Sequence, residues 1–203
     1  MKKISGVILA GGTNSRFGGK TKSNMIVGGI PIISRMVSIL SEVFDEIIIV
    51  TNKPEEFQDF RKLKIVQDEY KKIGPLGGIH AAMNASTNPA IFVFAGDMPF
   101  ITKELIVNQI EHYKKMNCDV LVPRMDSYDE PLHAIYNLST FIKLDYYLLS
   151  MQDYAIRDFL GKVEVNYLQL DETPEYRRIF TNINTPSDLS VADKLLHQNS
   201  EPY

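Results

Sequence analysis

The sequence predicts an α/β fold in which a mostly parallel sheet carries helices on both faces. Short apolar runs of strand length alternate along the chain with longer segments whose apolar residues recur at helical spacing. The early apolar runs contain few polar residues, which is typical of parallel strands buried on both faces. A regular alternation of strands and helices favours parallel strands that are connected by crossover helices.

The first half of the chain shows this exchange clearly. The run ISGVIL at 4–9 is the first strand, and Pro31 stands near the start of a helix over 31–43. The β-branched run IIIV makes 46–50 a fully buried strand. The expected elements that follow are a short helix at 54–60, a short strand at 64–67, a helix at 76–85 and a strand at 91–95.

The second half begins regularly and then loosens. Thr102 caps a helix that runs to about residue 115, with Glu104 in its first turn, and a strand follows at 119–123. Beyond Pro123 the pattern is less regular. The expected elements there are a strand at 133–136, a helix at 138–149, a half-exposed strand at 163–170 and a terminal helix at 186–197 behind Thr185.

Length and composition exclude several classes of protein. The 203 residues suit one domain, and 44% hydrophobic with 23% charged residues are ordinary globular values. A net charge of −3 with no basic block argues against nucleic acid or an anionic membrane as a partner. The single Cys118 excludes an internal disulfide framework and a cysteine-rich zinc site, and it fits a cytoplasmic location. No stretch is long and apolar enough to span a bilayer.

The glycine-rich segment LAGGTNSRFGGKTK, at 9–22, directly follows the first strand. Glycines at this place let backbone N–H groups approach phosphates closely. The dinucleotide motif G-x-G-x-x-G fails, because Gly11 and Gly12 are adjacent and the next glycine is Gly18. The P-loop motif also fails, because Asn14 stands where its first glycine belongs.

The remaining pattern, L-A-G-G-x-x-x-R-F-G-x-x-x-K, which ends at Lys22, resembles the nucleotidyltransferases, and within them the molybdenum cofactor guanylyltransferases. Five further segments share the resemblance and extend it over nearly the whole chain. They are GGIPII at 28–33, GPLGGI at 74–79, FAGDMPFI at 94–101, EPLHAIY at 130–136 and NINTPSDL at 182–189. The resemblance implies a three-layer, Rossmann-like (GT-A-like) fold with a mostly parallel sheet. It also implies one nucleotidyltransferase domain over 1–203, with a nucleotide-binding part at about 1–123 and an acceptor-binding part at about 124–203.

The resemblance implies catalytic roles for Arg16, Lys22 and Asp97. Arg16 and Lys22 would neutralise the triphosphate. Asp97 ends a buried strand, and one carboxylate with substrate phosphates and waters is the usual protein share of a Mg²⁺ site. A turn cap before Pro99 is the alternative role for Asp97.

Further residues are expected to bind the two substrates. An aspartate such as Asp68 suits guanine, because it can accept from both the N1–H and the N2 amine; a plain turn residue is the alternative. Asn182 and Asn184 can bind the acceptor or a metal-bound water. The segment Asn184-Thr185-Pro186 also fits a plain helix start with Thr185 as the N-cap, and both roles are compatible because the two asparagines precede the cap. The expected nucleotide-binding residues are Leu9, Ala10, Gly11, Gly12, Lys22, Asn52, Asp68, Gly74, Pro75, Leu76 and Gly78, and the expected acceptor-binding residues are Asn182, Asn184 and Arg157.

The resemblance implies that GMP passes from GTP to the terminal phosphate of the molybdopterin cofactor, giving molybdopterin guanine dinucleotide and pyrophosphate. The implied cofactor is Mg²⁺, and the implied protein contacts are transient ones with cofactor-supplying proteins or molybdoenzymes. Two alternatives stay open. One is a nucleotidyltransferase with another nucleotide or acceptor, of the cytidylyltransferase or sugar-phosphate type. The other is a non-catalytic cofactor-delivery protein.

Overall fold

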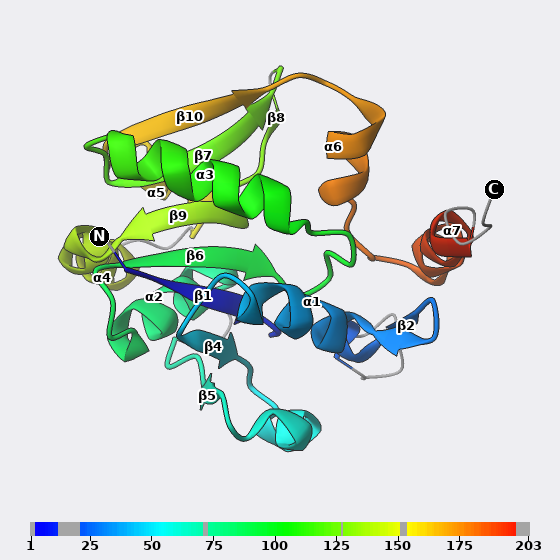
Figure 1. The fold of residues 1–203 in the computed structure, drawn as a ribbon. Coiled ribbons are helices and arrows are strands. Elements are labelled where there is room, and N and C mark those ends of the chain that lie inside the picture. The colour runs from blue at the N-terminus through cyan, green and yellow to red at the C-terminus, as the bar shows by residue number, and fades with distance from the viewer. Residues whose placement is uncertain (1–2, 12–20, 71–72, 127, 151–153, 198–203) are drawn as a thin grey trace.

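A central sheet of eight strands organises the chain (Figure 1). The computed structural model describes residues 3–11, 21–70, 73–126, 128–150 and 154–197. The strands are β1 (Ile4–Leu9), β4 (Ile47–Val50), β5 (Lys64–Val66), β6 (Ala90–Ala95), β7 (Val120–Met125), β8 (Tyr128–Asp129), β9 (His133–Asn137) and β10 (Val165–Leu170). Their order is β10-β7-β9-β6-β1-β4-β5, with β8 paired to β7.

Most neighbouring strands are parallel, as the sequence predicts. β1 pairs in parallel with β4 on one side and β6 on the other, and β4 pairs in parallel with β5. β7 and β10 are also parallel. The exceptions are β9, which lies antiparallel between β6 and β7, and the short β8, which pairs antiparallel with β7. The chain leaves β1 toward β5 and then returns to the other side of β1, so the strand order reverses at β1 and β6. Ligands of open α/β sheets bind at such a reversal, beside the carboxyl ends of the strands.

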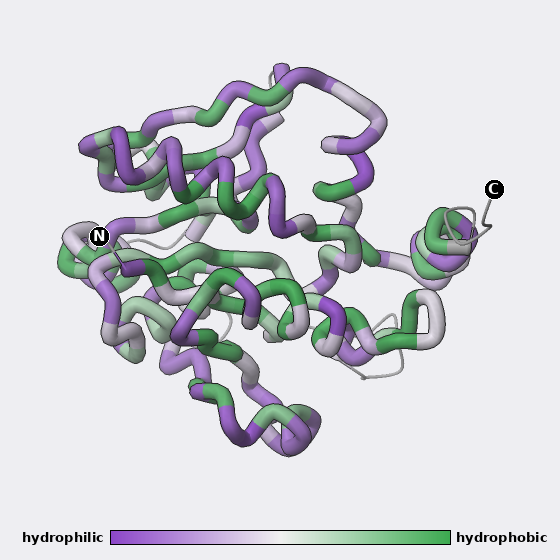
Figure 2. The backbone as a smooth tube through the Cα atoms, viewed as in Figure 1, coloured by the Kyte–Doolittle hydropathy of each residue, from purple (hydrophilic) through white to green (hydrophobic). Residues whose placement is uncertain are grey.

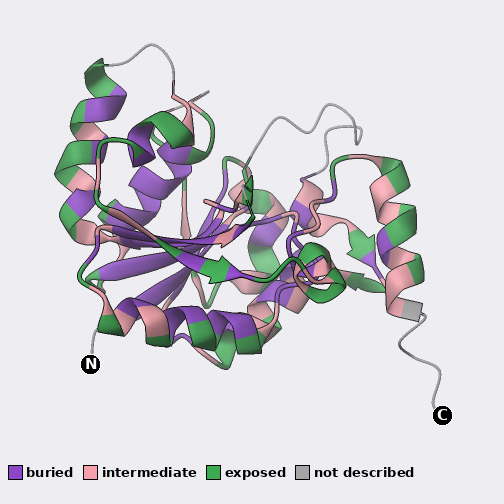
Figure 3. Cartoon of the chain, turned by 90° about the horizontal axis from the view of Figure 1, so that it is seen from above, coloured by how far each residue is buried: buried purple, intermediate pink, exposed green. Residues whose placement is uncertain are grey.

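Helices cover both faces of this sheet, which completes the predicted three layers (Figure 3). On one face, Ile8 and Phe92 share a core with α1 (Ile32–Ser41) and α3 (Lys103–Lys115). On the other face, Val7 and Val93 share a core with α2 (Pro75–Ala85), α4 (Phe141–Ser150) and α5 (Ile156–Leu160). Successive strand residues point to opposite faces, and those of β1 and β6 enter the two cores in turn. These central strands are mostly hydrophobic in colour along their length (Figure 2).

Several short elements were not predicted. They are the 3₁₀ turn η2 (Lys22–Asn24), the hairpin strands β2 (Ile26–Val27) and β3 (Ile30–Pro31), the strand β8, and the helices α5 and α6 (Pro174–Ile179). The hairpin turns at Gly28 and Gly29, whose φ angles of 60° and 75° favour glycine. Its Gly28 N–H donates to Asp193 Oδ1 (2.7 Å) in α7 (Pro186–His197), so a contact far along the sequence holds it. The expected helix at 54–60 is the 3₁₀ segment η3 (Pro54–Phe60).

None of the helices within the described ranges combines the length and the apolar character that a membrane crossing requires.

Candidate functional site

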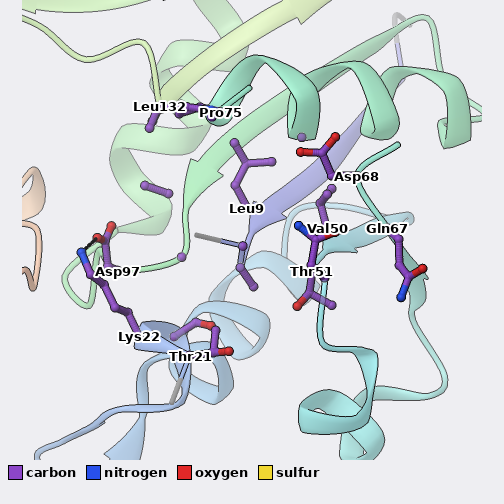
Figure 4. Close-up of a pocket in the computed structure, with 18 residues that line it drawn as sticks. Leu9, Thr21, Lys22, Val50, Thr51, Gln67, Asp68, Pro75, Asp97 and Leu132 are labelled. Atoms are coloured by element: carbon purple, nitrogen blue, oxygen red, sulfur yellow. Dashed lines mark hydrogen bonds and ion pairs between the residues drawn. The ribbon is translucent and has the colours of Figure 1, made fainter. Parts of the chain in front are cut away.

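A cavity of about 970 Å³ opens at the carboxyl ends of β1, β4 and β6 (Figure 4). It therefore lies at the reversal of strand order. Its lining comes from the strand ends, from the turn η2 and from the start of α2. The lining residues are Leu9, Ala10, Gly11, Thr21, Lys22, Ser23, Val50, Thr51, Asn52, Gln67, Asp68, Gly74, Pro75, Gly78, Ala95, Gly96, Asp97 and Leu132.

Gly96 brings the ends of β1 and β6 together. Its N–H donates to Leu9 O (3.0 Å), and a Cβ at this position would lie 2.7 Å from the same oxygen. No other residue fits without moving the backbone. The next residue, Asp97, is thereby placed at the cavity, and its carbonyl accepts from Ile183 N–H (2.9 Å). The close approach that Gly96 allows thus positions Asp97 and the segment behind it.

Lys22, Asp97 and Asn184 form a polar cluster at one side of the cavity. Lys22 Nζ donates to Asp97 Oδ2 (3.1 Å) and to Asn184 Oδ1 (2.6 Å). The Lys22 and Asp97 side chains are 24% and 20% exposed, so a ligand in the cavity can reach both. Figure 4 shows their paired side chains on the side away from Asp68 and Gln67.

Asp68 lies at the opposite side, against the start of α2. Its Oδ1 accepts from Tyr70 N–H (2.9 Å), and burial raises the pKa of its carboxyl. A Cβ at Gly77 would lie 2.6 Å and 2.7 Å from the two carboxylate oxygens of Asp68, so the glycine leaves space for this carboxylate. Gly74, with φ of 79°, precedes Pro75 at the first position of α2. Free N–H groups in the first helical turn favour an anion there.

The buried carboxyl group of Glu130 lies close enough to Asp97 for the two charges to interact. Glu130 is 5% exposed and accepts a hydrogen bond from Tyr128 Oη (3.0 Å). Burial raises the pKa of Glu130 to about 7, and the charge of Asp97 acts in the same direction. Near neutral pH, Glu130 is therefore partly protonated and adds less than one negative charge beside Asp97.

The donor set fits a Mg²⁺ ion that a bound nucleotide completes. Asp97 offers a carboxylate and Asn184 an amide oxygen, both of which are hard oxygen ligands. The described residues contain no group of three or more His, Cys, Asp or Glu side chains arranged to hold a metal. Mg²⁺ commonly binds one or two carboxylates and takes its other ligands from phosphates and water.

The cavity gathers most of the predicted site residues. Those that line it are Leu9, Ala10, Gly11, Lys22, Asn52, Asp68, Gly74, Pro75, Gly78 and Asp97. Asn184 reaches the cluster through Lys22. Gly12 and Arg16, also predicted, lie outside the described residues.

Three predicted residues lie elsewhere. Leu76 is fully buried in the core between α2 and the sheet, and it does not line the cavity. Arg157 is 93% exposed and faces Asp158 at 3.9 Å. Asn182 is not part of the cavity lining; its Nδ2 donates to Phe180 O (3.5 Å).

Other lining residues escaped the sequence argument. Thr51 and Gly96 directly follow predicted strands, and Gln67 is the last residue of the strand predicted at 64–67. The carboxyl ends of parallel strands meet at one edge of the sheet, and that rule was a signal that could have found them. Thr21 and Ser23 flank Lys22, and nothing in their residue types singled them out.

This arrangement defines a nucleotide-binding α/β protein: a glycine-rich strand end, a cation and a carboxylate meet where the strand order reverses. The model of the MobA-like NTP transferase domain matches residues 6–166. A protein from Natranaerobius thermophilus named "Probable molybdenum cofactor guanylyltransferase" is 37% identical over 203 residues, covering 95% of this chain and 96% of that one. A protein of the same name from Pelotomaculum thermopropionicum is 37% identical and covers 98% and 96%.

A solved structure with a related name has the same fold. Molybdopterin-guanine dinucleotide biosynthesis protein A from Archaeoglobus fulgidus superposes with a TM-score of 0.82 at 27% identity, covering 96% of this chain and 99% of that one. The chain belongs to the MobA-like NTP transferase family.

Proposed function

We propose that this protein transfers GMP from GTP to the terminal phosphate of the molybdopterin cofactor and releases pyrophosphate. The observation that carries the proposal is the Lys22–Asp97–Asn184 cluster, which faces Asp68 across one cavity. The cluster suits phosphates, and the Asp68 side suits a base. The relatives named as probable molybdenum cofactor guanylyltransferases, and the Archaeoglobus fulgidus protein of molybdopterin-guanine dinucleotide biosynthesis with the same fold, support this proposal.

The proposed reaction needs positioning and charge more than proton transfer. A phosphate oxygen of the acceptor attacks the α-phosphorus of GTP, and the bond to the bridging oxygen of pyrophosphate breaks. The attacking phosphomonoester is already anionic, because its second pKa is about 6. No general base is required, and the described lining contains no histidine.

The residues of the cluster would then act on the phosphates and on the metal ion. Lys22 binds the phosphates and stabilises the charge that develops on pyrophosphate. Asp97, with Asn184 beside it, would hold Mg²⁺, which supplies positive charge to the phosphates when it is bound. Arg16 is proposed to assist the phosphates, as the sequence predicts.

At the other side of the cavity, Asp68 would recognise guanine through its N1–H and N2 amine. The apolar Val50 lines the cavity on the Asp68 side, and Leu9 lies between the two sides (Figure 4). Asn52, at the end of β4, is proposed to contact the ribose or the base.

The remaining assignments follow the family resemblance. Asn182, Asn184 and Arg157 are proposed to bind the acceptor. The nucleotide-binding part is proposed to cover about 1–123 and the acceptor-binding part about 124–203 of one domain. A cytoplasmic location and transient contacts with cofactor-supplying proteins or molybdoenzymes are also proposed.

Nucleotide preference tests the proposal directly. Titration calorimetry with GTP, CTP, ATP and UTP, each with Mg²⁺, is expected to show tightest binding of GTP, since only guanine offers both donors to Asp68. A preference of about tenfold or more corresponds to one lost hydrogen bond to a charged group. Tighter binding of another nucleotide would contradict the guanylyl assignment and favour a sister transferase. Pyrophosphate release that depends on added molybdopterin then separates an enzyme from a delivery protein.

Substitution of Gly77 tests the proposed role of Asp68. In Gly77→Ala, the new Cβ would displace the Asp68 carboxylate, which can move because it ends a side chain. GTP affinity is expected to fall about tenfold with little change in the melting temperature. Gly161→Ala is the matched control, because its Cβ would meet no atom closer than 3.5 Å. Wild-type GTP affinity in Gly77→Ala would argue against base recognition by Asp68.

A further inference from the structure

The side chain of Lys22 is held by Asp97 and Asn184, and the backbone turn that carries it is held by a residue that does not line the cavity. It begins the 3₁₀ turn η2, which closes through Asn24 N–H to Thr21 O (3.0 Å) and Met25 N–H to Lys22 O (2.9 Å). Thr21 precedes the turn, and its side chain makes no capping hydrogen bond. The backbone N–H of Thr21 instead finds its acceptor in another part of the chain.

That acceptor is the carboxylate of Glu56. Its Oε2 accepts from Thr21 N–H (3.1 Å) and from Asn24 Nδ2 (3.2 Å), on the two sides of Lys22. Its Oε1 accepts from Lys53 Nζ (2.9 Å). Partial burial alone would raise the pKa of Glu56, but the hydrogen bonds from Thr21, Lys53 and Asn24 lower it to about 2. The carboxylate is therefore charged at neutral pH.

Glu56 is itself firmly placed. It lies on η3, whose Phe57 is fully buried in the core beneath α1 and the sheet. Its N–H donates to Lys53 O (3.0 Å), and Lys53 N–H donates to Thr51 Oγ1 (3.1 Å). Thr51 and Asn52 line the cavity, whereas Glu56 is not part of that lining. Glu56 thus fastens the turn that carries Lys22 to the end of β4.

We infer that Glu56 is a positioning residue that holds the turn around Lys22 so that the ammonium group meets the phosphates of the nucleotide. This inference rests on the proposed role of Lys22 in phosphate binding. Glu56 acts through Lys22 and does not touch the substrate. Its removal therefore weakens binding of a nucleoside triphosphate while leaving binding of the bare nucleoside unchanged.

The test is a double-mutant cycle measured by titration calorimetry with Mg²⁺. Glu56→Ala is expected to lower GTP affinity about tenfold and to change guanosine affinity less than twofold. In the Lys22→Ala background, Glu56→Ala is expected to change GTP affinity less than twofold. Glu56→Gln keeps an oxygen that can accept from Thr21 N–H, so it is expected to recover most of the loss. Glu55→Ala, an exposed glutamate on the same segment, is the matched control.

Three results would overturn the inference: an equal loss for guanosine, the same loss in the Lys22→Ala background, or wild-type GTP affinity in Glu56→Ala. The proposed function fails separately, if the wild-type protein prefers a different nucleotide. The same cycle with that nucleotide and its nucleoside then still tests Glu56. Absence of binding of any nucleoside triphosphate by the wild-type protein overturns both.

Discussion

Asp97→Asn is expected to slow acceptor-dependent pyrophosphate release by about 10²–10³-fold, the range found when one preorganised charge-stabilising group is removed. Asparagine keeps the size of the side chain and an oxygen that can accept from Lys22 Nζ. The substitution therefore removes mainly the negative charge, which Mg²⁺ requires. The Mg²⁺ concentration needed for half-maximal rate is expected to rise in parallel, and the melting temperature to change little.

Asp45→Asn is the matched control for Asp97→Asn. Asp45 is exposed and precedes β4, so it lies at the edge of the sheet opposite the cavity. It is expected to retain the wild-type rate and Mg²⁺ dependence. A rate for Asp97→Asn within twofold of the wild type would remove Asp97 from the proposed mechanism.

Lys22→Ala is expected to reduce turnover by about 10²-fold and to weaken GTP binding by about tenfold or more. The ammonium group faces the cavity beside Asp97, so its loss leaves the carboxylate there without this cation. Charge then builds on the departing pyrophosphate with less compensation. Single-turnover rates and calorimetric affinities separate the loss of catalysis from the loss of binding.

Lys62→Ala, which removes an exposed lysine beyond η3, is the control for Lys22→Ala. The comparison also bears on the delivery-protein alternative, since a pure carrier has no turnover to lose. Unchanged nucleotide binding and unchanged pyrophosphate release in Lys22→Ala would contradict the assignment of the cluster. A smaller combined loss in the Lys22→Ala, Asp97→Asn double variant than the two single losses multiplied would show that the two groups act together.

The sequence predicted the layers of this fold because its central strands are apolar on both faces. Ile4–Leu9, Ile47–Val50 and Ala90–Ala95 became neighbouring parallel strands. The direction of each strand was harder to predict from the sequence. His133–Asn137 has the apolar character of a buried strand, yet it pairs antiparallel on both sides. Apolar patterning reports burial, whereas strand direction depends on the connection. The short segment between Pro123 and His133 carries no helical pattern that could cross over to a parallel strand.

Most residues of the site could be predicted from the sequence, but the contacts between them were harder to predict. Lys22 and Asp97 were expected to serve one ligand, and they form an ion pair across 75 positions of sequence. Family patterning also pointed to Leu76, whose side chain faces the core because neighbouring residues of a helix turn to different sides. The Glu56 contact with Thr21 was invisible, since a glutamate in a short polar segment has many possible partners and only the folded chain selects one.

The contact between Lys22 and Asn184 also sets an order in time during synthesis. The two residues are 162 positions apart, so the ribosome delivers the second one roughly ten to thirty seconds after the first. Until then Lys22 and Asp97 can meet in a growing chain, but the Asn184 amide oxygen that accepts from Lys22 has not been made. The Lys22–Asn184 contact therefore forms only in chains translated past residue 184, and a chain halted before that residue would lack it.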